Sequence, residues 1–213
     1  MSVITKIEVQ KKNQERVNIY VDEKFFMAIY KELVFTFNLK KGNNIDEDYL
    51  RQILRNEMFL KCKNKALNIL SKSSQSEKRM KEKLSEDFEE DVIEEVIDFL
   101  KKYNFINDNE LASKIVSTNL NLNKCGKNKI KQNLYNKGIE KSAINEAISE
   151  INMEDEFENA LYLAQKRYTR LKNEDPKKAY AKVANHLAYK GFSYDIIKMV
   201  LNNIFKSDYY DDY

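Results

Sequence analysis

One pattern of apolar residues occurs three times along this chain. Each copy has two apolar residues four positions apart, then a turn, one further apolar residue and a second apolar pair with the same spacing. Residues four positions apart lie on one face of a helix, so every copy predicts a pair of packed helices. The residues are Met80, Leu84, Phe88, Ile93 and Ile97 in the first copy, Ile130, Leu134, Ile139, Ile144 and Ile148 in the second, and Val183, Leu187, Phe192, Ile197 and Leu201 in the third.

The turn between the two helices contains Lys137-Gly138 in the second copy and Lys190-Gly191 in the third. Glycine directly after a helix commonly takes the left-handed conformation, and the next apolar residue then folds back onto the core. Ser193 follows at the N-cap position of the next helix. The first copy is one residue shorter in this turn and has no glycine.

Capping boxes predict where further helices begin. Ser74-Gln75-Ser76-Glu77 and Asn107-Asp108-Asn109-Glu110 both have the required spacing of cap and acidic residue. With these helices, each repeat has three helices in about 50 residues, a period typical of repeat proteins.

The N-terminal residues follow a different period. Val3, Thr5, Ile7 and Val9 alternate with polar neighbours, as do Val17, Ile19 and Val21, and "KFFMAIY" is a candidate third strand. From Asp46 the period becomes helical, with one predicted apolar stripe that contains Leu50, Ile53, Leu54, Met58 and Ala66.

These patterns predict a mainly α fold of three tandem three-helix repeats in an elongated array, with a small β-like N-terminal extension. Only 4 Gly and 1 Pro occur in 213 residues, which favours long helices over all-β or dinucleotide-binding folds. The predicted regions are 1–45 for the extension, 46–107 for a connecting helix and the first repeat, 108–152 for the second repeat, 153–206 for the third and 207–213 for an acidic tail.

Motifs for catalysis and cofactor binding are missing from the sequence. There is no GxGxxG and no GxxxxGK[ST], and the single histidine, His186, has no HExxH around it. Carboxylates occur in runs such as "EDFEEDVIEE", which are typical of a solvated helix face. We therefore predict no catalytic, cofactor or metal site, and a protein that is not an enzyme.

The same reading indicates a soluble cytoplasmic protein. Cys62 and Cys125 form no CxxC pair, which suits a reducing compartment. The N-terminus has no signal-peptide pattern, and no apolar run approaches the roughly 20 residues that span a bilayer.

Positive charge is concentrated at one place in each repeat. Eight Lys or Arg residues against two acids lie in 61–83, six against one in 124–141, and eight against two in 166–190, whereas 86–98 holds eight carboxylates and no base. A row of such blocks could follow a phosphate backbone or an acidic protein groove. Alternatively, the charges only solubilise the helices and complement their dipoles. The candidate partner-binding residues are Lys72, Arg79, Lys83, Lys127, Lys129, Lys131, Lys137, Arg167, Arg170, Lys177, Lys178, Lys182 and Lys190.

The order and spacing of the three blocks resemble the RecX family over roughly residues 60–205. "ALNILSKSSQSEKRMKEKL" is similar to the opening of the family's first repeat, and "HLAYKGFSYDIIKMVL" to the end of its third. Two features depart from the family pattern: Gln75 stands where a basic residue is common, and the β-like N-terminus is an extension found in longer members. The family-like positions of the second repeat are Tyr103, Asn107, Asp108, Ala112, Gly126, Ile130, Leu134, Lys137 and Gly138.

This resemblance implies a monomeric regulator, without a cofactor, that binds the RecA–DNA filament and restrains its ATPase, strand-exchange and co-protease activities. Three alternatives stay open: a helical nucleic-acid-binding protein that acts independently of RecA, a scaffold for another complex and, last, an uncharacterised hydrolase. Direct contact with single- or double-stranded DNA is compatible both with the RecA regulator and with the independent nucleic-acid-binding protein. Tyr135, Tyr168, Tyr180 and Tyr189 lie near basic residues and could stack on bases, although packing is the more common role of such residues.

Overall fold

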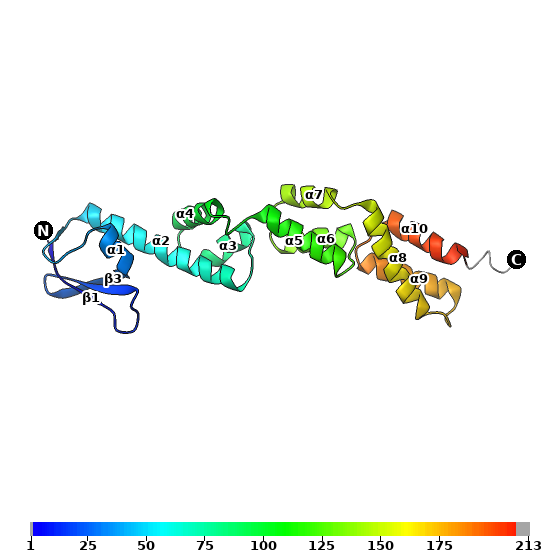
Figure 1. The fold of residues 1–213 in the computed structure, drawn as a ribbon, viewed down its shortest axis with the longest axis horizontal. Coiled ribbons are helices and arrows are strands. Elements are labelled where there is room, and N and C mark those ends of the chain that lie inside the picture. Colours follow the sequence, from blue (N-terminus) through cyan, green and yellow to red (C-terminus); the bar gives the residue numbers. More distant parts are fainter. Residues whose placement is uncertain (1, 208–213) are drawn as a thin grey trace. The chain divides into compact units, whose positions relative to one another are not determined.

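A computed structural model describes residues 2–207 of the chain (Figure 1). These residues divide into two units, one made of residues 2–73 and 80–105 and the other of residues 74–79 and 106–207. The predicted tail begins at residue 207, and its residues 208–213 lie outside the described part. No helix among the described residues is long and apolar enough to cross a membrane.

The N-terminal unit begins with an antiparallel sheet, which confirms the predicted strands. Its strands are β1 (Ser2–Val9), β2 (Arg16–Val21), β3 (Lys24–Tyr30) and the short β4 (Asn44–Ile45), in the order β3-β2-β1-β4. Val17, Ile19 and Val21 all face the core, as their alternation requires.

The alternation of Val3, Thr5, Ile7 and Val9 predicted that these side chains share one face of β1, and this prediction is wrong. Ile4 is fully buried whereas Val9 is 41% exposed. The pairing of β1 with β2 shifts register between Ile4 and Lys6. A bulge inserts one residue and reverses which side chains face inward, so Ile4 and Ile7 both pack on the core although they are three positions apart.

Two helices pack near this sheet, α1 (Lys31–Thr36) and the long α2 (Glu47–Lys72). Asp46 caps α2 by accepting a hydrogen bond from the Tyr49 amide at 2.8 Å. The predicted apolar stripe is partly wrong, because Leu54 and Met58 are 43% and 46% exposed. The buried face instead carries Ile53, Glu57 and Leu60, which are spaced four and three positions apart as one helix face requires.

Glu57 is a buried charge that the apolar pattern could not predict. Its carboxylate accepts a hydrogen bond from the Tyr30 amide at 2.7 Å and forms an ion pair with Arg16 at 2.8 Å. A buried carboxylate persists in a core only with such partners. Glu57 therefore joins α2 to β2 and β3.

The first repeat consists of α2, α3 (Glu77–Leu84) and α4 (Glu90–Lys102). Met80, Leu84, Ile93 and Ile97 are all buried, as predicted. The predicted cap is two residues early: the hydroxyl of Ser76, and not Ser74, accepts from the Arg79 amide at 3.2 Å.

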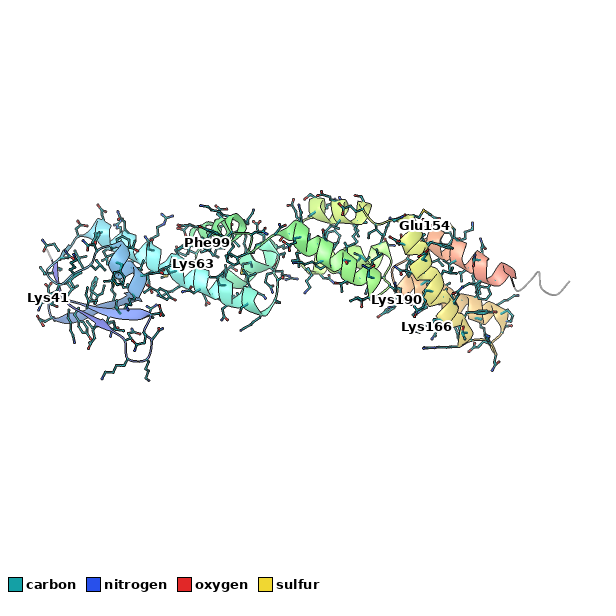
Figure 2. All side chains as sticks on the ribbon, in the orientation of Figure 1. Lys41, Lys63, Phe99, Glu154, Lys166 and Lys190 are labelled. Carbon is teal, nitrogen blue, oxygen red and sulfur yellow. The ribbon has the colours of Figure 1, made fainter. Side chains whose placement is uncertain are left out.

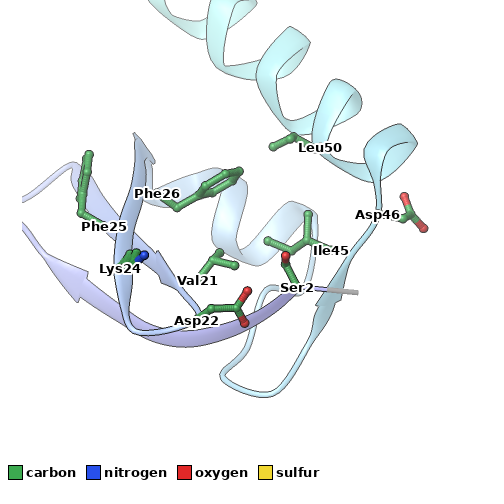
Figure 3. Close-up of a pocket in the computed structure, with 9 residues that line it drawn as sticks. All are labelled: Ser2, Val21, Asp22, Lys24, Phe25, Phe26, Ile45, Asp46 and Leu50. Carbon is green, nitrogen blue, oxygen red and sulfur yellow. The ribbon is translucent and has the colours of Figure 1, made fainter.

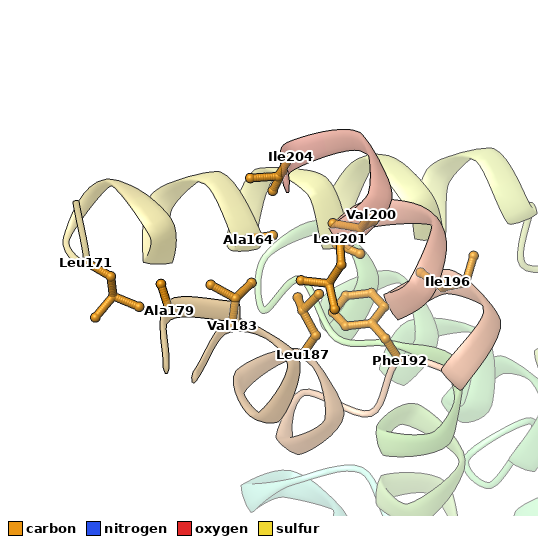
Figure 4. Packing of buried hydrophobic residues seen from close by; sticks show 11 residues of the cluster. Ala164, Leu171, Ala179, Val183, Leu187, Phe192, Ile196, Val200, Leu201 and Ile204 are labelled. Carbon is orange, nitrogen blue, oxygen red and sulfur yellow. The ribbon is translucent and has the colours of Figure 1, made fainter. Parts of the chain in front are cut away.

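The second repeat consists of α5 (Asp108–Asn121), α6 (Lys127–Asn136) and α7 (Lys141–Ser149), and the third of α8 (Met153–Thr169), α9 (Pro176–Tyr189) and α10 (Tyr194–Ser207). Asn107 and Ser193 cap the helices that follow them, as predicted. Figure 4 shows the core of the third repeat, where Leu187 and Phe192 meet Val200 and Leu201. On α10, Ile196 is buried more deeply than the predicted Ile197.

The two Lys-Gly turns have the predicted conformation. The φ angles of Gly138 and Gly191 are +77° and +87°. The amides of the following residues, Ile139 and Phe192, donate back to the carbonyls of Leu134 and Leu187. This is the hydrogen bond by which a left-handed residue ends a helix.

Candidate partner-binding surface

Ten of the thirteen predicted basic residues lie on the second helix of a repeat or at its C-cap. Arg79 and Lys83 are on α3; Lys127, Lys129, Lys131 and Lys137 are on α6 and its C-cap; Lys177, Lys178, Lys182 and Lys190 are on α9 and its C-cap. Lys72, Arg167 and Arg170 lie at the ends of α2 and α8. The structure thus places most of the candidates on equivalent elements.

The start of α3 packs on the turn of the second repeat. Ser76 Oγ donates to the Lys137 carbonyl at 2.7 Å, and Arg79 Nη2 donates to the Asn136 carbonyl at 3.0 Å. The Glu77 amide donates to the Asp108 carboxylate at 3.0 Å. The first turn of α3 thus obtains hydrogen-bond partners from a segment far away in the sequence.

The start of α6 packs on the turn of the third repeat in the same way. The Gly126 amide donates to the Lys190 carbonyl and the Asn128 amide to the Gly191 carbonyl, both at 3.0 Å. The Lys127 amide donates to Glu156 Oε1 at 2.9 Å. We call each of these two arrangements a joint: a helix start on a Lys-Gly turn, with one carboxylate from the next repeat on the first helical amide.

Several predicted partner-binding residues therefore have partners within the chain. Lys127 Nζ lies 4.0 Å from Glu156 Oε2, and Lys190 Nζ donates to the Asn123 carbonyl at 3.3 Å. Lys182 forms an ion pair with Glu174 at 2.5 Å. Figure 2 labels Lys190 at this joint.

Other candidates keep their charge available. Six of the candidates make no ion pair with a carboxylate of the described residues, and five of these six side chains are exposed, Lys131 being partly buried. The six are Lys72, Lys131, Lys137, Arg170, Lys177 and Lys178.

The four tyrosines near the basic residues fall into two groups. Tyr168 and Tyr180 pack on Phe205, with ring centroids 4.9 and 5.3 Å apart. Tyr135 and Tyr189 are 41% and 75% exposed. Lys129 Nζ lies 5.5 Å from the centroid of the Tyr189 ring, so this aromatic ring and a cation share one surface.

His186 is half-buried on α9. Burial lowers the pKa of its imidazole, and the positive charges of Arg167 and Lys190 lower this pKa further. At pH 7 the ring is therefore neutral, because its ordinary pKa of 6.5 is already below that pH. No group of three potential metal ligands occurs among the described residues.

A hollow of about 580 Å³ lies in the N-terminal unit between β3 and the start of α2 (Figure 3). Phe25, Phe26 and Leu50 contribute apolar surface, and Asp22 and Asp46 contribute carboxylates. None of the thirteen predicted residues lines this hollow, and the sequence patterns did not indicate it.

Models of RecX regions match most of the chain. The regulatory protein RecX N-terminal domain matches residues 2–46, and the first, second and third three-helix domains of RecX match residues 62–100, 107–148 and 154–201. Regulatory protein RecX of Clostridioides difficile (strain 630) is 67% identical over 211 residues, which cover 99% of this chain and 100% of that protein. The chain belongs to the RecX family. Regulatory protein RecX of Clostridium botulinum (strain Alaska E43 / Type E3) is 38% identical over 99% of this chain and 100% of its own length.

Solved RecX structures have the same fold. A crystal structure of regulatory protein RecX superimposes with a TM-score of 0.76 at 31% identity, over 94% of this chain and 98% of that one. The crystal structure of RecX from Lactobacillus salivarius superimposes with a TM-score of 0.66 at 33% identity, over 70% of this chain and 97% of that one. The match over residues 2–46 corrects the resemblance drawn from the sequence, which began near residue 60: the β-sheet region is itself a RecX domain. The relatives are named as regulatory proteins.

Proposed function

We propose that this RecX protein binds the RecA–DNA filament and inhibits its ATPase, strand-exchange and co-protease activities. Membership of the RecX family supports this function, and the recurrence of basic residues on the second helix of each repeat is the structural observation that carries it. A filament presents the same groups at regular intervals, and a repeat protein offers cations at matched positions for such a surface.

The mechanism needs no catalysis. A protein that binds one state of a filament more tightly than another shifts the filament toward the preferred state. Lys131 on α6 and Lys177 and Lys178 on α9 are the cations that we assign to the contact, because no carboxylate of the described chain neutralises them. We further propose that the protein acts in the cytoplasm as a monomer, and that 46–107, 108–152 and 153–206 are its repeat units.

Titration of RecA ATPase on single-stranded DNA tests this function. We expect inhibition at or below one RecX chain per RecA, and we expect it to persist when DNA is in excess. A protein that binds nucleic acid independently of RecA inhibits only by sequestering DNA, so full ATPase activity would return with added DNA. That outcome would replace the RecA proposal with the nucleic-acid alternative.

Charge reversal tests the assigned surface. In the triple variant Lys131→Glu, Lys177→Glu and Lys178→Glu, we expect about tenfold or more loss of inhibition and a weaker dependence of binding on salt. Each lost contact between a lysine and a phosphate or carboxylate removes one salt-sensitive charge pair. The matched control reverses Lys11, Lys12 and Lys41, three exposed lysines in loops of the N-terminal unit. Equal inhibition by both triple variants would show that charge at the repeats is not the determinant.

A further inference from the structure

Arg167 is a half-buried cation that has no counter-ion among residues 2–207. Its Nε atom is buried and has no hydrogen-bond partner, and Arg167 makes no ion pair with any described residue. The residues one turn away on its helix, Leu163, Ala164, Arg170 and Leu171, include no acid. A guanidinium removed from water without a carboxylate is costly, and an incoming anion relieves that cost.

Two basic side chains, Arg167 and Lys190, act on His186. His186 and Lys190 are one turn apart on α9 and its C-cap, and α9 packs against α8, which carries Arg167. The charges of Arg167 and Lys190 both act on His186, and no carboxylate is among the groups that shift it. Lys182, one turn earlier on α9, is already neutralised by Glu174. The charges that act on His186 from these two helices are therefore of one sign.

An exposed aromatic ring adjoins this site. Tyr189 directly precedes Lys190, is 75% exposed and has Lys129 Nζ 5.5 Å from its ring centroid. Cations beside an exposed aromatic ring are the combination by which proteins bind single-stranded nucleic acid, because phosphates meet the charges and bases stack on the ring. An acidic protein segment would use the charges but would have no need of the ring.

We propose that Arg167, His186 and Lys190 hold a backbone phosphate of a single-stranded nucleic acid while Tyr189 stacks on a base of the same strand. This inference rests on the proposed function and deepens it, since it assigns the third repeat to the DNA strand of the filament. The contact itself does not require RecA.

Binding at this site takes up a proton. A phosphate beside His186 favours the imidazolium, so the pKa of His186 rises in the complex. Affinity for the strand then increases as the pH falls through the pKa of His186 in the complex. The increase is complete below the lower pKa that His186 has in the free protein. The charges that act on His186 from α8 and α9 are those of Arg167 and Lys190.

The single histidine of the chain makes this measurable by NMR on the full-length protein. We would follow the imidazole resonances against pH in the absence and presence of a twelve-nucleotide thymidine strand, inorganic phosphate or polyglutamate at equal ionic strength. The proposal expects a higher His186 pKa with the thymidine strand and a smaller rise with inorganic phosphate. An unchanged pKa with the strand overturns it, and so does an equal rise with polyglutamate, which would assign the site to an acidic protein.

Variants separate the two parts of the site. Arg167→Gln and Lys190→Gln should each weaken binding of the thymidine strand about tenfold and abolish the rise in the His186 pKa, whereas Tyr189→Leu should weaken the strand about fivefold and leave inorganic phosphate unaffected. Lys172→Gln, an exposed cation beyond the end of α8, is the matched control and should bind as wild type does. If Lys172→Gln lost as much affinity for the strand as Arg167→Gln, binding would depend on net charge alone, and the proposal would be overturned. Because RecA is absent, these results are independent of the ATPase titration, and either proposal can fail alone.

Discussion

Gly126 and Gly191 are in contact at the joint between the second and third repeats. A Cβ atom on Gly191 would lie 2.3 Å from the Lys129 backbone nitrogen, and one on Gly126 would lie 2.5 Å from the Gly191 carbonyl carbon. Gly126 needs no left-handed backbone, since its φ is −78°. The absence of a side chain there serves the approach of two backbone segments.

Alanine substitutions separate backbone conformation from this close approach. Gly138→Ala and Gly191→Ala share the cost of a positive φ, but only Gly191→Ala also meets a backbone, so we expect it to destabilise more. Gly126→Ala should cost about 1–3 kcal/mol from overpacking alone. Urea unfolding measures all three, and unchanged midpoints for Gly126→Ala and Gly191→Ala would contradict the joint.

Cys62 is a protected thiol. It is fully buried on α2, and burial raises its pKa to about 11. At pH 8 about one molecule in a thousand would carry a thiolate, so alkylation by iodoacetamide should be slow in the folded protein and accelerate toward pH 11. Mass spectrometric mapping of labelled Cys62 checks this, with urea-unfolded protein as the fully reactive control. Rapid labelling of the native chain at pH 8 would be inconsistent with the burial.

At the scale of elements, α3 and α6 begin alike and α9 begins differently. Asp108 and Glu156, from the following repeat, accept from the first amides of α3 and α6. Helix α9 begins with Pro176, which has no amide proton, and the preceding residue, Asp175, caps it by accepting from the Lys178 amide at 3.1 Å. The last repeat therefore needs no further repeat to complete its second helix.

Loss of the Glu156 carboxylate tests the joint. Glu156→Ala leaves the partly buried Lys127 amide without its acceptor and should cost about 1–3 kcal/mol in the free energy of unfolding. Glu156→Gln keeps an amide oxygen as acceptor and should cost less. Glu158→Ala removes an exposed carboxylate from the same helix and should stay within about 0.5 kcal/mol of wild type. Equal effects for the alanine variants at 156 and 158 would exclude a specific role for Glu156.

At the scale of the whole molecule, the repeats predict an extended particle, because each repeat of an array touches mainly its neighbours. A compact chain of this length would have a radius of gyration of about 17 Å. We expect small-angle scattering of the monomer to give a clearly larger value. A radius near that of a compact globule would contradict the array.

The sequence by itself determined the features that depend on neighbours along the chain. Apolar spacing placed the buried face of the second helix in each repeat, Lys-Gly turns placed two left-handed residues, and Asn107 and Ser193 marked helix starts. These signals are local because a helix brings residues three and four apart together. The family resemblance used the same spacing.

Only the tertiary structure decided which charges are neutralised. Glu57 and Glu156 are buried although no apolar pattern marks them, because their partners come from segments more than 25 residues away. The bulge in β1 depends on its pairing with β2 and reverses an alternation that looked regular. Lysines on the second helix of a repeat therefore separate into those paired with a carboxylate at a joint, such as Lys127, and those left to face a partner, such as Lys177. Electrostatic pairing acts through space, and chain order alone does not specify which charges meet.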